Sequence, residues 1–119
     1  MQNIKRFYDK PYMTIGIIVV NIIVFVLMSI SGSTLDAQYM AAHGAMYPEY
    51  IKDGQYWRLF TSMFMHFGLM HILNNMVVLG AVGQIVEKAM GHVKLLITFL
   101  VSGMCGSVLS YIVMLYNND

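Results

Sequence analysis

Residues 66–86 read HFGLMHILNNMVVLGAVGQIV and contain no Asp, Glu, Lys or Arg. Two further charge-free runs lie on either side of this stretch, at residues 11–35 and residues 95–118. A helix of about 20 residues crosses the hydrocarbon core of a bilayer, and each run is long enough to do so. The sequence therefore predicts an all-α membrane protein with three transmembrane helices, at about residues 13–30, 66–86 and 93–116, and a long interfacial first loop at about residues 31–65.

The composition supports this class. Of the 119 residues, 58% are hydrophobic and 11% are charged, whereas about 25% of an ordinary soluble domain is charged. The net charge of +1 gives no basic field for nucleic acid, and a single cysteine cannot form an internal disulfide. We therefore expect one domain or less, with the lipid bilayer as a partner and no nucleic acid.

Basic residues on either side of the spans predict the direction of insertion. Lys5, Arg6 and Lys10 precede the first span, and Lys88 and Lys94 flank the second connection, while the first loop carries more acidic than basic residues. Short cytoplasmic loops carry an excess of Lys and Arg. The N-terminus and the second connection are thus expected in the cytoplasm, and the C-terminus of the chain outside it.

Polar residues within the second span need an explanation, because such groups are costly in hydrocarbon unless they face the protein interior or water. His71 and Asn75 lie about 40° apart on a helix and share a face, whereas His66 would lie about 140° from His71. They either form hydrogen bonds across helices, worth about 0.6 kcal/mol each, or donate to the oxyanion of a hydrolytic intermediate. The histidine spacing and the absence of an acidic residue argue against zinc, and we expect no metal or cofactor.

Small residues indicate where helices approach closely. Spacings of four place small side chains on one face of a helix, which is typical of tight packing in membranes. We expect helix packing, and no nucleophile, at Gly80 and Gly83 of the second span and at Ser102, Gly103, Gly106, Ser107 and Ser110 of the third.

Three motifs follow one another along the chain: Trp57-Arg58 in the first loop, His71-x-x-x-Asn75 in the second span, and Glu87 before the second connection. In this order and spacing they resemble the rhomboid intramembrane serine proteases, and the resemblance covers nearly the whole chain. It implies an enzyme of a bacterial-type plasma membrane that cleaves transmembrane protein substrates.

The resemblance also implies roles for individual residues. His71 and Asn75 match side chains of the oxyanion hole, and Trp57, Arg58, His66 and Glu87 match positions with a structural or positioning role. Without the resemblance, the favoured interpretation of Trp57 and Arg58 is an ordinary anchor at the membrane interface, an aromatic ring beside a cation.

The chain departs from the family at its catalytic centre. The family's nucleophile is a serine in a Gly-x-Ser-Gly turn at the start of the fourth helix, and its base is a histidine on the sixth, but the chain has no such motif and no histidine after His92. Nucleophilic catalysis requires both groups. We therefore interpret residues 1–119 as a partial rhomboid domain, the first half of a six-helix bundle, inactive without its missing C-terminal helices. The alternative is a non-catalytic rhomboid-like protein that binds transmembrane segments or a partner subunit.

Overall fold

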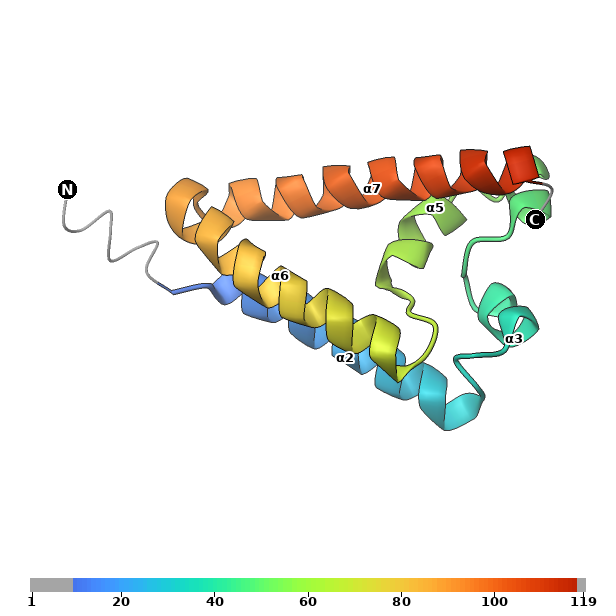
Figure 1. The fold of residues 1–119 in the computed structure, drawn as a ribbon, viewed down its shortest axis with the longest axis horizontal. Coiled ribbons are helices and arrows are strands. Elements are labelled where there is room, and N and C mark those ends of the chain that lie inside the picture. The colour runs from blue at the N-terminus through green and yellow to red at the C-terminus, as the bar shows by residue number, and fades with distance from the viewer. Residues whose placement is uncertain (1–9, 118–119) are drawn as a thin grey trace.

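The computed structural model describes residues 10–117, and within this range the chain forms helices joined by loops. Three helices are long and apolar enough to cross a membrane: α2 (Tyr12–Ser31), α6 (Leu69–Met90) and α7 (His92–Asn117). Many of their large apolar side chains are exposed, as expected for surfaces that contact lipid. The prediction of an all-α integral membrane protein with three spans is confirmed (Figure 1).

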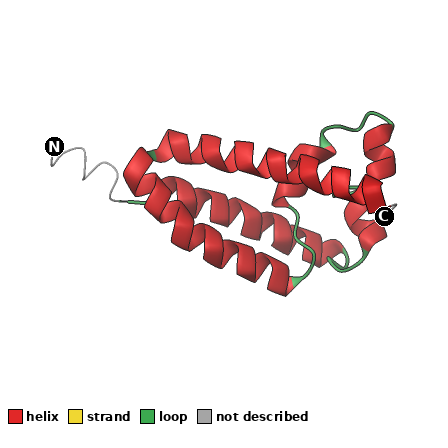
Figure 2. Ribbon diagram, turned by 45° about the horizontal axis from the view of Figure 1, so that its top comes forward, coloured by secondary structure: helices red, strands yellow, loops and turns green. Residues whose placement is uncertain are grey.

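The first loop, which the sequence predicts only as a long segment at the membrane interface, is built from short helices. These are α3 (Ala37–Ala42), α4 (Pro48–Lys52), α5 (Arg58–Thr61) and the 3₁₀ turn η1 (Ser62–Phe64). The Asp36 carboxylate caps α3 by accepting a hydrogen bond from the Gln38 amide at 3.0 Å, and Pro48 opens α4 at a position where no amide donor is needed. Figure 2 shows these short helices gathered around the end of the molecule at which α7 finishes.

The second long helix begins at Leu69, three residues later than predicted. Gly68 precedes it with a φ of 85°, a left-handed conformation that favours glycine and ends the preceding turn. His66 therefore lies before the helix, and the helical angle that separated it from His71 in the sequence analysis does not apply.

The long helices form a V. α6 lies along α2, whereas α7 leaves α6 at the turn around Gly91 and diverges from it, with α5 and η1 between the open ends (Figure 1). A Cβ atom on Gly83 would come within 3.0 Å of Thr14, and one on Gly80 would lie 3.7 Å from Ile18. The glycines of α6 thus let it approach α2, and they do not pack against the small residues of α7.

The small residues of α7 have mixed surroundings. The Ser107 hydroxyl is buried and lies 3.3 Å from that of Ser62 in η1, and Gly103 lies against Met63 of the same turn. Gly106 has open space where its Cβ would be, and Ser102 and Ser110 are exposed. The middle of α7 therefore packs on the first loop, and much of its small-residue face lines pockets.

Candidate functional site

His71 and Asn75 lie one turn apart on α6, and both side chains are exposed. The Nδ1 atom of His71 accepts a hydrogen bond from the Phe67 backbone amide at 3.2 Å. A neutral ring that accepts at Nδ1 carries its hydrogen on Nε2. The loop before α6 thus makes His71 a hydrogen-bond donor through Nε2, and Asn75 adds a donor through its amide.

His66 lies beside His71. The two ring centroids are 5.0 Å apart in an edge-on arrangement, so the expectation that the two histidines face apart is wrong, because His66 precedes the helix. The His66 side chain is 5% exposed. Burial lowers the pKa of His66 and the neighbouring His71 lowers it further, so the ring is neutral at pH 7.

Two adjoining pockets flank these residues. One, of about 470 Å³, lies in the V between α6 and α7 and is lined by Asn75 and His66; the other, of about 450 Å³, is lined by His71. Met63, Phe99 and Gly103 line both pockets and so stand between them. The predicted oxyanion donors therefore share one face of α6 but open into neighbouring cavities.

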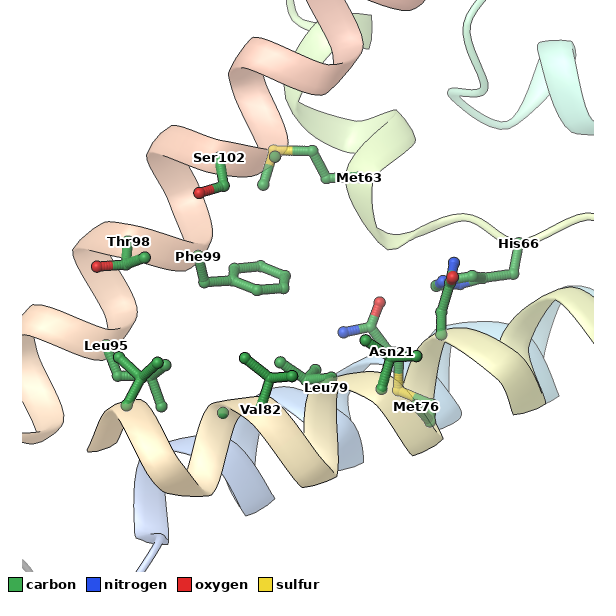
Figure 3. Close-up of a pocket in the computed structure, with 15 residues that line it drawn as sticks. Asn21, Met63, His66, Met76, Leu79, Val82, Leu95, Thr98, Phe99 and Ser102 are labelled. Carbon is green, nitrogen blue, oxygen red and sulfur yellow. The ribbon is translucent and has the colours of Figure 1, made fainter. Parts of the chain in front are cut away.

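Figure 3 shows the first pocket, in which apolar side chains such as Leu79, Val82 and Phe99 make up most of the lining. Asn21 of α2 also reaches this pocket although it is 1% exposed. Asn21 is not among the site residues predicted from the sequence. The sequence did contain a signal for it, because Asn21 is an asparagine within a mostly apolar span. A polar group in hydrocarbon usually has a partner or a function.

Arg58 is buried at the start of α5 and is 5% exposed. Its Nη1 atom donates to the carbonyl oxygens of Ala41 and Ala45, the second at 2.8 Å, and its Nε atom donates to the Gln55 side chain at 2.8 Å. The planar guanidinium can reach several acceptors at once, which an ammonium cannot do in the same geometry. Arg58 therefore ties the end of α3 and the segment after it to the beginning of α5.

Two aromatic rings cover the same guanidinium. Its central carbon lies 4.6 Å from the centroid of the Tyr50 ring and 4.7 Å from that of the Trp57 ring, distances typical of cation–π contacts. Trp57 is 53% exposed, so about half of its surface is not covered by the described part of the chain. The Trp-Arg pair thus combines an internal brace with an exposed aromatic side chain.

We predict that Arg58→Ala loosens the first loop. The change removes the guanidinium donor from the carbonyls of Ala41, which keeps the Gly44 amide at 3.3 Å, and Ala45, and an unsatisfied buried acceptor costs about 1–3 kcal/mol. The rate of hydrogen–deuterium exchange in residues 37–57 should rise at least tenfold. Arg58→Lys should give an intermediate rate, because lysine keeps the positive charge but lacks the planar group of several donors. Exchange in α2 should stay unchanged, and equal exchange of the loop in Arg58→Ala and the unmodified chain would contradict the role of a brace.

Glu87 is fully buried near the end of α6 and accepts hydrogen bonds from two other helices. Its carboxylate receives the backbone amides of Met13 at 2.7 Å and Thr14 at 2.8 Å and the Thr14 hydroxyl at 2.7 Å, and it pairs with Nδ1 of His92. The first amides of a helix have no partner within it, and α2 has no side-chain cap of its own. Glu87 thus caps α2 from another helix and joins the ends of all three spans.

Among the described residues, no group of three His, Cys, Asp or Glu side chains could hold a metal ion. His71, Asn75 and His66 lie together, whereas Arg58 and Glu87 lie apart from them and organise the first loop and the helix ends.

Comparison with known proteins identifies relatives. The Rhomboid domain matches residues 53–118. Over 103 residues the chain is 33% identical to "Rhomboid protease GluP" of Bacillus subtilis (strain 168), a match that covers 87% of this chain and 20% of the relative. Over 92 residues it is 38% identical to "Rhomboid protease GlpG" of Pectobacterium atrosepticum, covering 77% of this chain and 32% of the relative.

A plant protein is similar to the same degree. "RHOMBOID-like protein 7" of Arabidopsis thaliana is 38% identical over 84 residues, which cover 71% of this chain and 26% of the relative. No solved structure gives a significant match. The matches cover between 20% and 32% of the length of these relatives. The match to the Rhomboid domain extends over more than half of the residues of this chain. The chain therefore belongs to the rhomboid family.

Proposed function

We propose that this chain supplies the oxyanion-stabilising part of a rhomboid-type intramembrane serine endopeptidase that cleaves transmembrane protein substrates. The observation that supports it is the hydrogen bond from the Phe67 amide to His71 Nδ1, which leaves Nε2–H as a fixed donor one turn from the Asn75 amide. Fixed donors in a water-poor site stabilise the charge that develops on a tetrahedral intermediate. Membership of the rhomboid family makes this chemistry the natural use of the two side chains.

The proposal requires a nucleophile and a base from helices that follow this chain in a longer polypeptide. The sequence has no Gly-x-Ser-Gly motif, and the matches described above cover 20% to 32% of those relatives. In this proposal residues 1–119 are the first half of a six-helix rhomboid domain and are inactive alone. The V between α6 and α7 leaves a face of each helix open to such neighbours.

The proposal is tested with the whole reading frame that contains this chain. We expect the full product, co-expressed with a reporter joined to a transmembrane segment, to release the reporter, and residues 1–119 alone to release none. Substitution of a serine in a downstream Gly-x-Ser-Gly turn should abolish release. A reading frame without such a turn, whose product binds the reporter without cutting it, would contradict the protease and support the non-catalytic alternative.

We further propose that the N-terminus and the turn between α6 and α7 face the cytoplasm, in a bacterial-type plasma membrane. Lys88 at the end of α6 and Lys94 at the start of α7 support this orientation. Alkaline phosphatase fused after Asp119 should be active, because it folds only outside the cytoplasm, and green fluorescent protein at the same position should be dark. The reverse pattern would overturn the orientation.

A further inference from the structure

A further cavity, of about 450 Å³, lies between α2 and the first loop. Val20, Val24 and Met28 of α2 form one wall of this slot, and residues of α5, η1 and the turn after α3 form the other. Among the described residues, none from α6 or α7 lines the slot, and it shares no lining residue with the pocket in the V. It has one residue, Met65, in common with the pocket beside His71. The slot is thus formed by the first span and the first loop alone.

The two walls give the slot an elongated form. Val20, Val24 and Met28 follow one another at intervals of four residues, so they form a single row along one face of α2. At 1.5 Å per residue, this row is about 12 Å long. On the opposite wall the rings of Phe60 and Phe64 lie against each other, with their centroids 5.5 Å apart. The slot therefore runs along α2 between aliphatic and aromatic side chains.

The polar side chains of the lining are Thr61 and His43. The Thr61 hydroxyl donates to the Gly44 carbonyl at 2.6 Å, so it has a partner within the loop. Nδ1 of His43 lies 2.8 Å from the Tyr39 carbonyl and must be the donor, because a carbonyl oxygen only accepts. The slot therefore suits an occupant that is apolar over most of its length.

His43 marks the end of the slot that lies nearest to the membrane surface. Its ring is exposed and lies 4.4 Å from that of Tyr39, measured between centroids. The Tyr39 hydroxyl donates to the Met28 carbonyl at 2.6 Å, close to Ser31, where α2 ends. The slot is therefore apolar along the span and polar where the span reaches the interface, which is the pattern of a molecule with a hydrocarbon chain and a polar head.

The size of the slot decides between a hydrocarbon chain and a helix. A volume of about 450 Å³ spread over roughly 12 Å gives a mean cross-section of about 40 Å². A helix about 10 Å across needs a cross-section of about 80 Å². Water is not retained in apolar cavities. One extended hydrocarbon chain thus fits the slot, whereas a transmembrane helix does not.

Lipid has direct access to the slot. Ile23 and Leu27 lie beside the row on α2 and are 52% and 59% exposed, so the slot continues the face of α2 that contacts lipid. The row occupies the second half of α2, and its length of about 12 Å is close to the depth of one leaflet, which is half of a hydrocarbon core of about 30 Å. We propose that one acyl chain of a membrane phospholipid occupies the slot, with its headgroup beside His43.

The bound chain joins the first loop to the first span. It supplies the contacts that the rings of Phe60 and Phe64 lack while the slot is empty, since an unfilled cavity loses the dispersion attraction of its walls. Met28 and Met65 adapt to the shape of the chain, because methionine side chains are flexible and apolar. The site depends on no nucleophile or base, so it does not rest on the proposed protease function.

The first test counts phospholipids that stay bound after purification in detergent, by native mass spectrometry of the whole product of the reading frame. Val24→Phe should retain one phospholipid fewer than the unmodified protein, because a phenyl ring takes the place of several methylene groups of the chain. Ile23→Phe is the matched control. It adds the same ring at the next position of α2, which does not line the slot, and should retain as many phospholipids as the unmodified protein.

Equal retention by Val24→Phe and the unmodified protein would overturn the proposal, and this result is expected if a later segment of the polypeptide fills the slot. A loss of the same size in Ile23→Phe would also overturn it, because the lipid would then be bound to the outer face of α2.

The second test uses the unmodified protein and decides the matter if Val24→Phe does not fold. The protein is placed in nanodiscs whose phospholipid carries a diazirine near the end of one acyl chain, and the adducts formed on illumination are mapped by mass spectrometry. Adducts should form on Phe60, Phe64 and Met65 inside the slot. Adducts on outward residues such as Ile23 and Leu27, with none inside the slot, would overturn the proposal. Neither test involves cleavage, so either outcome leaves the protease proposal intact.

Discussion

Glu87→Ala is expected to lower the free energy of unfolding by about 3 kcal/mol, the largest loss of stability that we expect from a single substitution in this chain. The carboxylate accepts the Met13 amide, the Thr14 amide and the Thr14 hydroxyl, and all three are left unpaired when it is removed. A lost helix cap alone costs about 1 kcal/mol, and hydrogen bonds to a charged group contribute more than neutral ones. The side chain is 0% exposed, so bulk water does not replace it.

Reversible unfolding in mixed micelles measures the effect, and two further variants interpret it. Glu87→Gln keeps one acceptor oxygen and should lose about half as much. Gln84→Ala, an exposed change one turn earlier on α6, should stay within about 0.5 kcal/mol of the unmodified chain. If Glu87→Ala unfolds at the same denaturant concentration as Gln84→Ala, the cap does not contribute to stability.

Much of the fold could be predicted because lipid imposes simple requirements on a sequence. The charge-free runs predict α2 and α7 to within one residue at each end, since a span must be long and apolar. The start of α6 was missed by three residues, because Gly68 ends the preceding turn by a backbone conformation that hydropathy does not register. The short helices of the first loop were missed for a related reason: segments of three to six residues are too brief to show a periodic pattern.

The candidate site could be predicted only in part. His71 and Asn75 follow from their spacing, because residues four apart share a helix face. The proximity of His66 to His71 and the place of Asn21 in the pocket lining depend on how the loop and α2 meet α6, and no local pattern encodes such contacts. Thr14 and His92 were missed as partners of Glu87 for the same reason, since they come from different helices.

His71→Ala and Asn75→Ala, made in the full reading frame, are each expected to slow cleavage of a transmembrane reporter about 10²- to 10³-fold, the typical cost of losing one oxyanion donor. The loss should fall on kcat with little change in KM, because the donors act on charge that exists only in the transition state. His71→Ala removes the Nε2–H that the Phe67 amide orients, so its effect tests whether this side chain contributes to catalysis.

The chain offers a matched control for the asparagine. Asn74 is the neighbouring residue on α6, also an exposed asparagine, but points about 100° away from Asn75 around the helix. Asn74→Ala should retain cleavage within about threefold, and expression of all three variants should be equal. If Asn75→Ala cleaves as fast as Asn74→Ala, Asn75 is not an oxyanion donor, and its place beside the pocket serves hydration or packing instead. A double variant of His71 and Asn75 that loses little more than either single variant would show that the two donors act on one oxyanion.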